Sequence, residues 1–215
     1  MNPIPQQMVV VVHGLWLTGG AMTILRNRLE YMGYQARSFS YPSVNADLSH
    51  NAAELFAFVQ DLDAETIHFV GHSMGGLLAL QMLQEHDEPR IGRVVLAGSP
   101  YQDIHAIRNL MRHPFTQSVV GKSISQWLSQ VKPNVAARYE IGIIAGDRSM
   151  GLGRLMTHLE TPNDGTITVA ETQVPGAKDS IVLHVSHSEM LISADVARQA
   201  AHFLETGRFI RSSAL

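Results

Sequence analysis

Cysteine is absent from the 215 residues of this chain, which excludes disulfides, thiolate metal ligands and a cysteine nucleophile. The chain also lacks an excess of positive charge, because 19 Asp and Glu outnumber 16 Lys and Arg, for a formal net charge of -3. A chain with this charge has no general attraction for polyanions. We therefore expect no nucleic-acid partner.

Long hydrophobic runs are missing as well. The first apolar run, residues 8–12, is short, and no Lys or Arg precedes it. A secretory signal needs an apolar run of about 7 to 15 residues, and a membrane-spanning helix needs about 20. We therefore expect a cytoplasmic protein with no stable membrane insertion.

The chain does contain short β-branched segments that alternate with segments of helical periodicity. Hydrophobic residues make up 45% of the chain, enough for the core of one α/β domain spanning 1–215. Each expected strand either ends in Ser, His or Asp or is followed directly by His and Gly. The expected strands are 8–12, 66–73, 92–99, 139–147 and 180–187. The expected helices follow several of them: 20–32, 48–60, 74–86 and 190–204.

This alternation of strands and helices predicts an α/β fold with a doubly wound, mostly parallel sheet and helices on both faces. Parallel strands that are buried on both sides carry continuous apolar runs, as these segments do. Right-handed crossovers place successive helices over the sheet, and ligands bind at the carboxyl ends of the strands. Functional residues are therefore expected where the strands end.

One connection, approximately residues 100–135, is too long to be a simple crossover. Its apolar residues predict amphipathic helices over 104–111 and 119–128, with a break at His113 and Pro114. Two interpretations remain open for this insertion. It is either a crossover helix followed by a surface helix, or a helical lid over the functional cleft.

The segment "GHSMGG", residues 71–76, fits the pattern Gly-x-Ser-x-Gly. This pattern carries meaning where a strand precedes it and a helix follows, and both are predicted here. The sharp turn then exposes the hydroxyl of Ser73 at the edge of the sheet, as a nucleophile requires. A helix N-terminus that binds an anion is the alternative, but neither a phosphate-loop lysine nor Gly-x-Gly-x-x-Gly is present.

A nucleophilic serine also needs donors for the oxyanion that forms when it attacks a carbonyl group. The first expected strand ends at His13 and Gly14. The turn that follows can direct its backbone N–H groups toward the helix that begins after Ser73. We expect the N–H groups of Leu15 and Met74 to form the oxyanion hole.

The base and the acid that orients it each have two candidates. His187 ends the last expected strand and is favoured as the base over His184, which lies within that strand. Asp164, in an Asn-Asp-Gly turn, is favoured as the acid over Asp147. His72 is adjacent to the serine on a sharp turn, where its side chain should point away, so we interpret it as structural.

With Ser73, Asp164 and His187 in this order, the chain resembles the α/β-hydrolase superfamily, most closely its small bacterial lipases and esterases. The motifs that carry the resemblance are "VVVVHGLW", "GHSMGG", "PNDGTITVAET" and "VSHSEML". The resemblance implies that Ser73 is the nucleophile, His187 the general base and then acid, and Asp164 the orienting acid, with Leu15 and Met74 as backbone donors. It implies no cofactor and no metal. Little chain precedes the first strand, so we expect a minimal sheet of about six strands.

These residues predict a serine hydrolase that cleaves carboxylic esters through an acyl-serine intermediate, with a small-molecule ester or acyl compound as its partner. Trp16, Leu17 and the insertion are expected to line an apolar acyl pocket, unless they only pack on one another. A thioesterase or acyltransferase would use the same residues, and a non-catalytic relative that binds a small molecule is a further alternative. An exposed apolar lid could also support a homo-oligomer.

Overall fold

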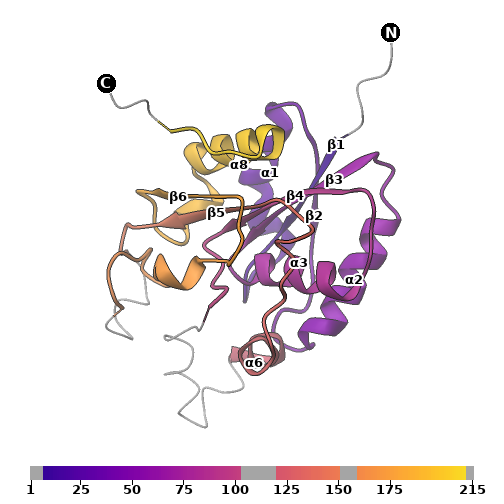
Figure 1. Cartoon of the computed structure of the whole chain (residues 1–215), viewed down its shortest axis with the longest axis horizontal. Helices are drawn as coiled ribbons and strands as arrows, with labels where there is room; N and C mark the ends of the chain where they lie inside the picture. The colour runs from indigo at the N-terminus through magenta and orange to yellow at the C-terminus, as the bar shows by residue number, and fades with distance from the viewer. Residues whose placement is uncertain (1–6, 103–119, 151–158, 212–215) are drawn as a thin grey trace.

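The centre of the molecule is a sheet of six parallel strands (Figure 1). The computed structural model describes residues 7–102, 120–150 and 159–211. The strand order is β2-β1-β3-β4-β5-β6, with every adjacent pair parallel. The strands are β1 (Gln7–Val12), β2 (Gln35–Phe39), β3 (Thr66–His72), β4 (Ile91–Ala97), β5 (Ile141–Gly146) and β6 (Asp179–Leu183). This confirms the predicted parallel α/β sheet of about six strands.

Helices cover both faces of the sheet, as predicted (Figure 1). They are α1 (Thr23–Tyr31), α2 (Leu48–Gln60), α3 (Met74–Glu85), α6 (Lys122–Ser129) and α8 (Ala194–Thr206). Single turns of 3₁₀ helix occur at η1 (Gly19–Met22), η2 (Ala170–Thr172) and η3 (Glu189–Leu191). None of the described helices is long and apolar enough to cross a membrane.

Strand β1 shows why both faces must be covered. Val10 and Val12 belong to the core cluster that includes residues of α2, α3 and α6. Val9 and Val11 belong to a second cluster with residues of α1 and α8. Side chains alternate between the two faces along a strand, so an unbroken run of valines requires apolar cover on both sides.

The described half of the long insertion is part of the core. Helix α6 matches the second helix predicted there, and its Trp127 is completely buried in the cluster of α2 and α3. The Gln126 carboxamide oxygen accepts hydrogen bonds from the first N–H groups of α2, at Leu48 and Ser49 (2.7 and 3.2 Å). The helix predicted at 104–111 lies outside the described residues, so a lid there stays a prediction.

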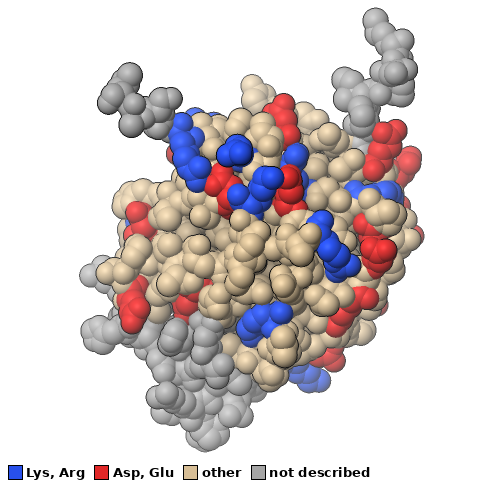
Figure 2. All heavy atoms as spheres, in the orientation of Figure 1, with Lys and Arg blue, Asp and Glu red and all other residues tan. Residues whose placement is uncertain are grey.

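Charged side chains of both signs are interspersed over the face of the molecule shown in Figure 2. The described residues include several ion pairs, such as Arg93 with Glu140 (2.6 Å) and Arg211 with Asp179 (2.6 Å). Pairs of this kind leave little unbalanced charge where they occur.

Candidate active site

Ser73 lies at a strained turn between β3 and α3. Strand β3 ends at His72 and α3 begins at Met74, and the backbone angles of Ser73 are φ 53° and ψ -125°. A non-glycine residue in this region costs on the order of 1–3 kcal/mol, so the surrounding structure must impose it. The Ser73 N–H is held by the carbonyl oxygen of Ala97 on β4 (2.9 Å).

The glycines on either side of this turn allow the backbones to approach one another. A Cβ atom at Gly71 would overlap the backbone of Gly76, and one at Gly75 would overlap the carbonyl oxygen of Val12. The start of α3 therefore lies directly against the end of β1. These two close approaches, of Gly71 to α3 and of Gly75 to β1, explain why the motif requires Gly at both positions.

His187 reaches the same edge of the sheet from the loop that follows β6. Its ring is close to Gly98, where an added Cβ atom would lie 3.1 Å from Nδ1 of His187. Gly98 directly follows Ala97, whose carbonyl holds Ser73. The His187 carbonyl oxygen is also 3.0 Å from Nε2 of His72, the residue before Ser73. Ser73 and His187 thus lie on adjoining segments of the chain.

Asp164 is the carboxylate that contacts His187. Its Oδ2 is 2.7 Å from Nδ1 of His187, and its carbonyl oxygen accepts the His187 N–H (2.9 Å). Its Oδ1 accepts the N–H groups of Thr166 and Ile167 (2.9 and 2.7 Å). Only 1% of the Asp164 surface is exposed, so the His187 contact is shielded from solvent. The tight Asn-Asp-Gly turn fixes the carboxylate, with Gly165 at φ 91°.

The two alternative candidates pair with each other instead. Nδ1 of His184 is 2.8 Å from Oδ1 of Asp147, and the side chains are 78% and 38% exposed. Strand β6 ends at Leu183, so His184 and His187 both lie in the following loop, although the sequence predicted a strand through 187. In an exposed pair of this kind, solvent screens most of the interaction.

The turn after β1 faces the N-terminus of α3, where the two predicted oxyanion donors lie. A Cβ atom at Gly14 would lie 3.0 Å from Cβ of Ser73. Neither the Leu15 N–H nor the Met74 N–H donates to an acceptor among the described residues. Because Met74 is the first residue of α3, its N–H has no acceptor within the helix and carries the positive end of the helix dipole.

Residues after β2, which the sequence patterns did not single out, hold this turn in place. Tyr41 donates its N–H to Nε2 of His13 (3.2 Å) and its hydroxyl to the His13 carbonyl (2.9 Å). Nε2 is therefore an acceptor, so Nδ1 of His13 carries the hydrogen and donates to the Gly14 carbonyl (2.8 Å). Burial lowers the pKa of His13, which keeps the ring neutral. The Ser43 hydroxyl accepts the N–H of Trp16 (3.1 Å).

The two residues expected to line an acyl pocket differ in exposure. Trp16 is 57% exposed and has φ 61°, whereas Leu17 is half-buried. Leu15, between the turn glycine and Trp16, packs its side chain against the core. The indole of Trp16 therefore lies at the surface beside the turn.

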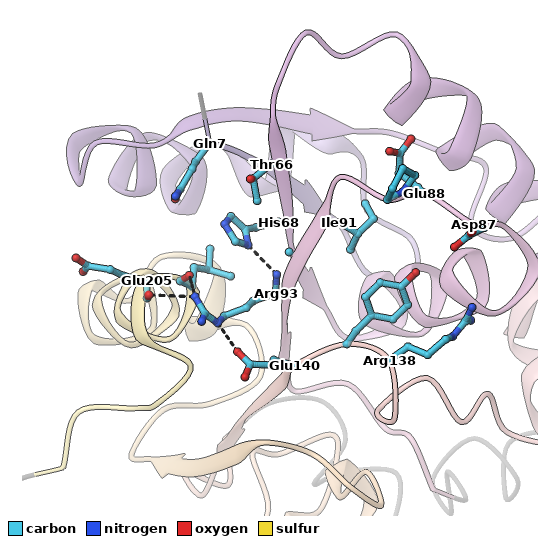
Figure 3. Close-up of a pocket in the computed structure, with 14 residues that line it drawn as sticks. Gln7, Thr66, His68, Asp87, Glu88, Ile91, Arg93, Arg138, Glu140 and Glu205 are labelled. Carbon is cyan, nitrogen blue, oxygen red and sulfur yellow. Dashed lines mark hydrogen bonds and ion pairs between the residues drawn. The ribbon is translucent and has the colours of Figure 1, made fainter. Parts of the chain in front are cut away.

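A cavity of about 550 Å³ lies at the opposite edge of the sheet (Figure 3). It is bordered by Gln7 and Thr66, which begin β1 and β3. Its central cation, Arg93, is already engaged by Glu140 (2.6 Å) and by the Leu204 carbonyl (2.8 Å). Parallel sheets bind ligands at their carboxyl edge, so this cavity is not the predicted site. In the part of the chain that the structure describes, no cluster of three His, Asp or Glu could hold a metal ion.

Comparisons with known proteins concern the family and the fold of this chain. Residues 9–201 match the model of the alpha/beta hydrolase family. The fold is similar to that of a Bacillus licheniformis lipase in its propeptide form, with a TM-score of 0.78 and 19% identity over 100% of this chain and 53% of that chain. It is also similar to a metagenomic carboxyl esterase (TM-score 0.64, 20% identity, 85% of this chain and 65% of that one).

A carboxylesterase from Bacillus subtilis has the same fold, with a TM-score of 0.60 and 13% identity over 96% of this chain and 85% of that chain. The chain spans about half the length of the Bacillus licheniformis lipase and about two thirds of that of the metagenomic esterase. At these identities the structural similarities show a shared fold.

Proposed function

The chain belongs to the alpha/beta hydrolase family, and from this premise we propose that it hydrolyses carboxylic esters through an acyl-serine intermediate. The observation that carries the proposal is the contact between the ring of His187 and the buried carboxylate of Asp164 (2.7 Å) beside the strained Ser73. A histidine held by a carboxylate beside a serine at a sharp strand-to-helix turn is the arrangement that nucleophilic acyl transfer requires.

In the proposed reaction, the Ser73 hydroxyl oxygen attacks the ester carbonyl carbon while Nε2 of His187 takes its proton. Because Nδ1 of His187 donates to Asp164, Nε2 carries the lone pair that the proton needs. The carboxylate of Asp164 stabilises the imidazolium ion that results. The imidazolium then protonates the departing alkoxide, which leaves an acyl group on Ser73.

The N–H groups of Leu15 and Met74 stabilise the negative charge on the carbonyl oxygen in both tetrahedral intermediates. Water then attacks the acyl-serine, His187 takes a proton from that water, and Ser73 leaves with the proton back on its oxygen. The products are a carboxylic acid and an alcohol, and the enzyme returns to its starting state. These steps use only side chains and backbone groups of the chain.

The exposed Trp16 beside the oxyanion turn supports an apolar acyl group in the substrate. An indole ring on the rim of the site buries apolar surface when an alkyl chain packs against it, and this contributes about 25 cal/mol per Å². We propose esters of apolar acyl chains, with Trp16 and Leu17 contacting the acyl part.

Labelling with a fluorophosphonate, measured as intact mass, tests the proposed nucleophile. We expect one adduct on the wild type and none on Ser73→Ala or His187→Ala. Ser188→Ala is the matched control, because this exposed serine follows His187 and should leave labelling unchanged. Hydrolysis of p-nitrophenyl esters of increasing acyl length, compared with matching thioesters, then tests the substrate class. An unlabelled, folded wild type would refute the proposal.

A further inference from the structure

We propose that His72 is a positioning residue that fixes the position of the base, His187, relative to the nucleophile, Ser73. This inference rests on the function proposed above. His72 is the last residue of β3 and precedes Ser73 directly. Its Nε2 is 3.0 Å from the His187 carbonyl oxygen, 115 positions away in the sequence. The two imidazole rings pack with centroids 4.7 Å apart at an angle of 49°.

The chemistry of this contact fixes the tautomer of His72. A carbonyl oxygen only accepts hydrogen bonds, so Nε2 of His72 must carry the hydrogen and donate it. Nδ1 then has a lone pair, and it is buried without a hydrogen-bond partner among the described residues. His72 therefore donates one hydrogen bond, and its acceptor is the backbone carbonyl of His187.

Burial keeps this ring uncharged. Only 3% of the His72 surface is exposed, and burial, with His187 close by, lowers the pKa of His72 from 6.5 to about 3. A charged ring at this distance would oppose the imidazolium that His187 forms during the reaction. A neutral His72 can support His187 without that repulsion, which suits a positioning role.

His187 needs such support because it lies in a loop beyond an edge strand. Strand β6 has β5 on one side and no further described strand on the other, and it ends four residues before His187. Asp164 holds the ring and the N–H of His187. His72, the neighbour of Ser73, donates a hydrogen bond to the His187 carbonyl. One side chain thus links the positions of nucleophile and base.

Substitutions at position 72 test this role through kcat and KM for p-nitrophenyl ester hydrolysis. We expect His72→Leu to lower kcat by about 100-fold, the cost of misplacing a reacting group by about 1 Å, with little change in KM. His72→Gln, whose amide can reach the carbonyl, should recover most of this loss, and the shorter His72→Asn should not. Equal rates for the two amide variants would overturn the inference, and this comparison also decides it if His72→Leu does not fold.

His68→Leu is the matched control. His68 lies on the same strand, is equally buried at 3% exposure, and contacts the Arg93 N–H (2.8 Å) instead of the site. We expect this variant to lose stability but keep kcat. A fall in kcat equal to that of His72→Leu would mean that the loss reflects a disturbed strand and would refute the positioning role.

A double-mutant cycle shows whether His72 acts through His187. In a His187→Ala background, His72→Leu should cause no further loss of the residual rate, because the base to be positioned is gone. A further loss of similar size would instead place the effect on Ser73 or the oxyanion turn and overturn the inference. A wild type that is neither labelled nor active would refute the proposed function itself, and this inference with it.

Discussion

The carboxylate of Asp164 makes three hydrogen bonds, two at one oxygen and one at the other. Two backbone N–H groups fix Oδ1, and the ring of His187 meets Oδ2. A carboxylate with both oxygens directed in this way keeps one orientation, so it holds the imidazole in the tautomer that leaves Nε2 available. The exposed pair of Asp147 and His184 has the same chemistry, but solvent surrounds it.

Replacing each aspartate with Asn should show which of the two pairs takes part in catalysis. We expect Asp164→Asn to lower kcat by about 10⁴-fold, because an amide favours the wrong histidine tautomer. Asp147→Asn is the matched control and should leave kcat nearly unchanged, because Asp147 pairs with the exposed His184 and not with the proposed base. The measurement is kcat for p-nitrophenyl ester hydrolysis. A large loss of kcat in Asp147→Asn with little loss in Asp164→Asn would instead assign Asp147 as the acid.

At the scale of elements, the site depends on one crossing of β1 and α3. Gly75, in the first turn of α3, packs against the carbonyl oxygens of Val12 and His13. This contact brings the turn that contains Leu15 next to the first N–H groups of the helix. The two proposed oxyanion donors come from different elements, so their spacing is set by how closely these elements approach.

A methyl group at position 75 should therefore separate the two elements. We expect Gly75→Ala to lower the free energy of unfolding by about 2–3 kcal/mol, the cost of overpacking a tight contact, and to lower kcat as the donors move apart. Gly20→Ala is the control, because a Cβ atom there meets only Oγ1 of Thr18 at 3.5 Å. Urea unfolding measures both variants. Equal stability of Gly75→Ala and wild type would contradict the packing argument.

The sequence patterns failed to predict strand β2, because this strand lacks the apolar run that marks the central strands. This strand lies at the edge of the sheet, and only Ala36 and Phe39 of its five residues are buried. An edge strand needs no continuous apolar run, so its sequence does not resemble those of the central strands. As a result Tyr41 and Ser43, which follow β2 and hold the turn after β1, were missed as well.

For the whole molecule, the buried histidines link stability to pH. Burial lowers the pKa of His13, and it lowers that of His68 to about 4 and of His72 to about 3. In the unfolded chain these rings bind a proton at a pKa near 6.5. Below that pH the unfolded chain holds more protons than the folded protein, so stability falls as the pH falls.

Urea unfolding across the acid range should reveal this linkage. We expect the free energy of unfolding to rise between about pH 4.5 and pH 6 by about 1.4 kcal/mol per pH unit for each of His68 and His72, and to level off above about pH 7. Carboxylates with a lowered pKa, such as Glu140, make stability depend on pH only below the pKa that they have in the unfolded chain. His68→Leu should reduce the slope, and an unchanged slope would exclude His68 as a source.

The sequence by itself determined the central strands, the helices and the turn that contains Ser73. These features follow from local rules: apolar periodicity specifies strands and helices, and the spacing of Gly71, Ser73 and Gly75 specifies a turn that only small residues allow. The resemblance in four ordered motifs identified the same segments. Local patterns sufficed because each feature is formed by neighbours in the chain.

Only the tertiary structure decided which carboxylate meets which histidine. Asp147, Asp164, His184 and His187 all follow strands, and nothing in their spacing fixes how the loops fold over the sheet edge. The pairing depends on long-range packing, which buries Asp164 with His187 and leaves Asp147 with His184 in solvent. The contact of His72 with His187 was hidden for the same reason, because it joins two segments that meet only when β3 and the loop after β6 reach the same edge.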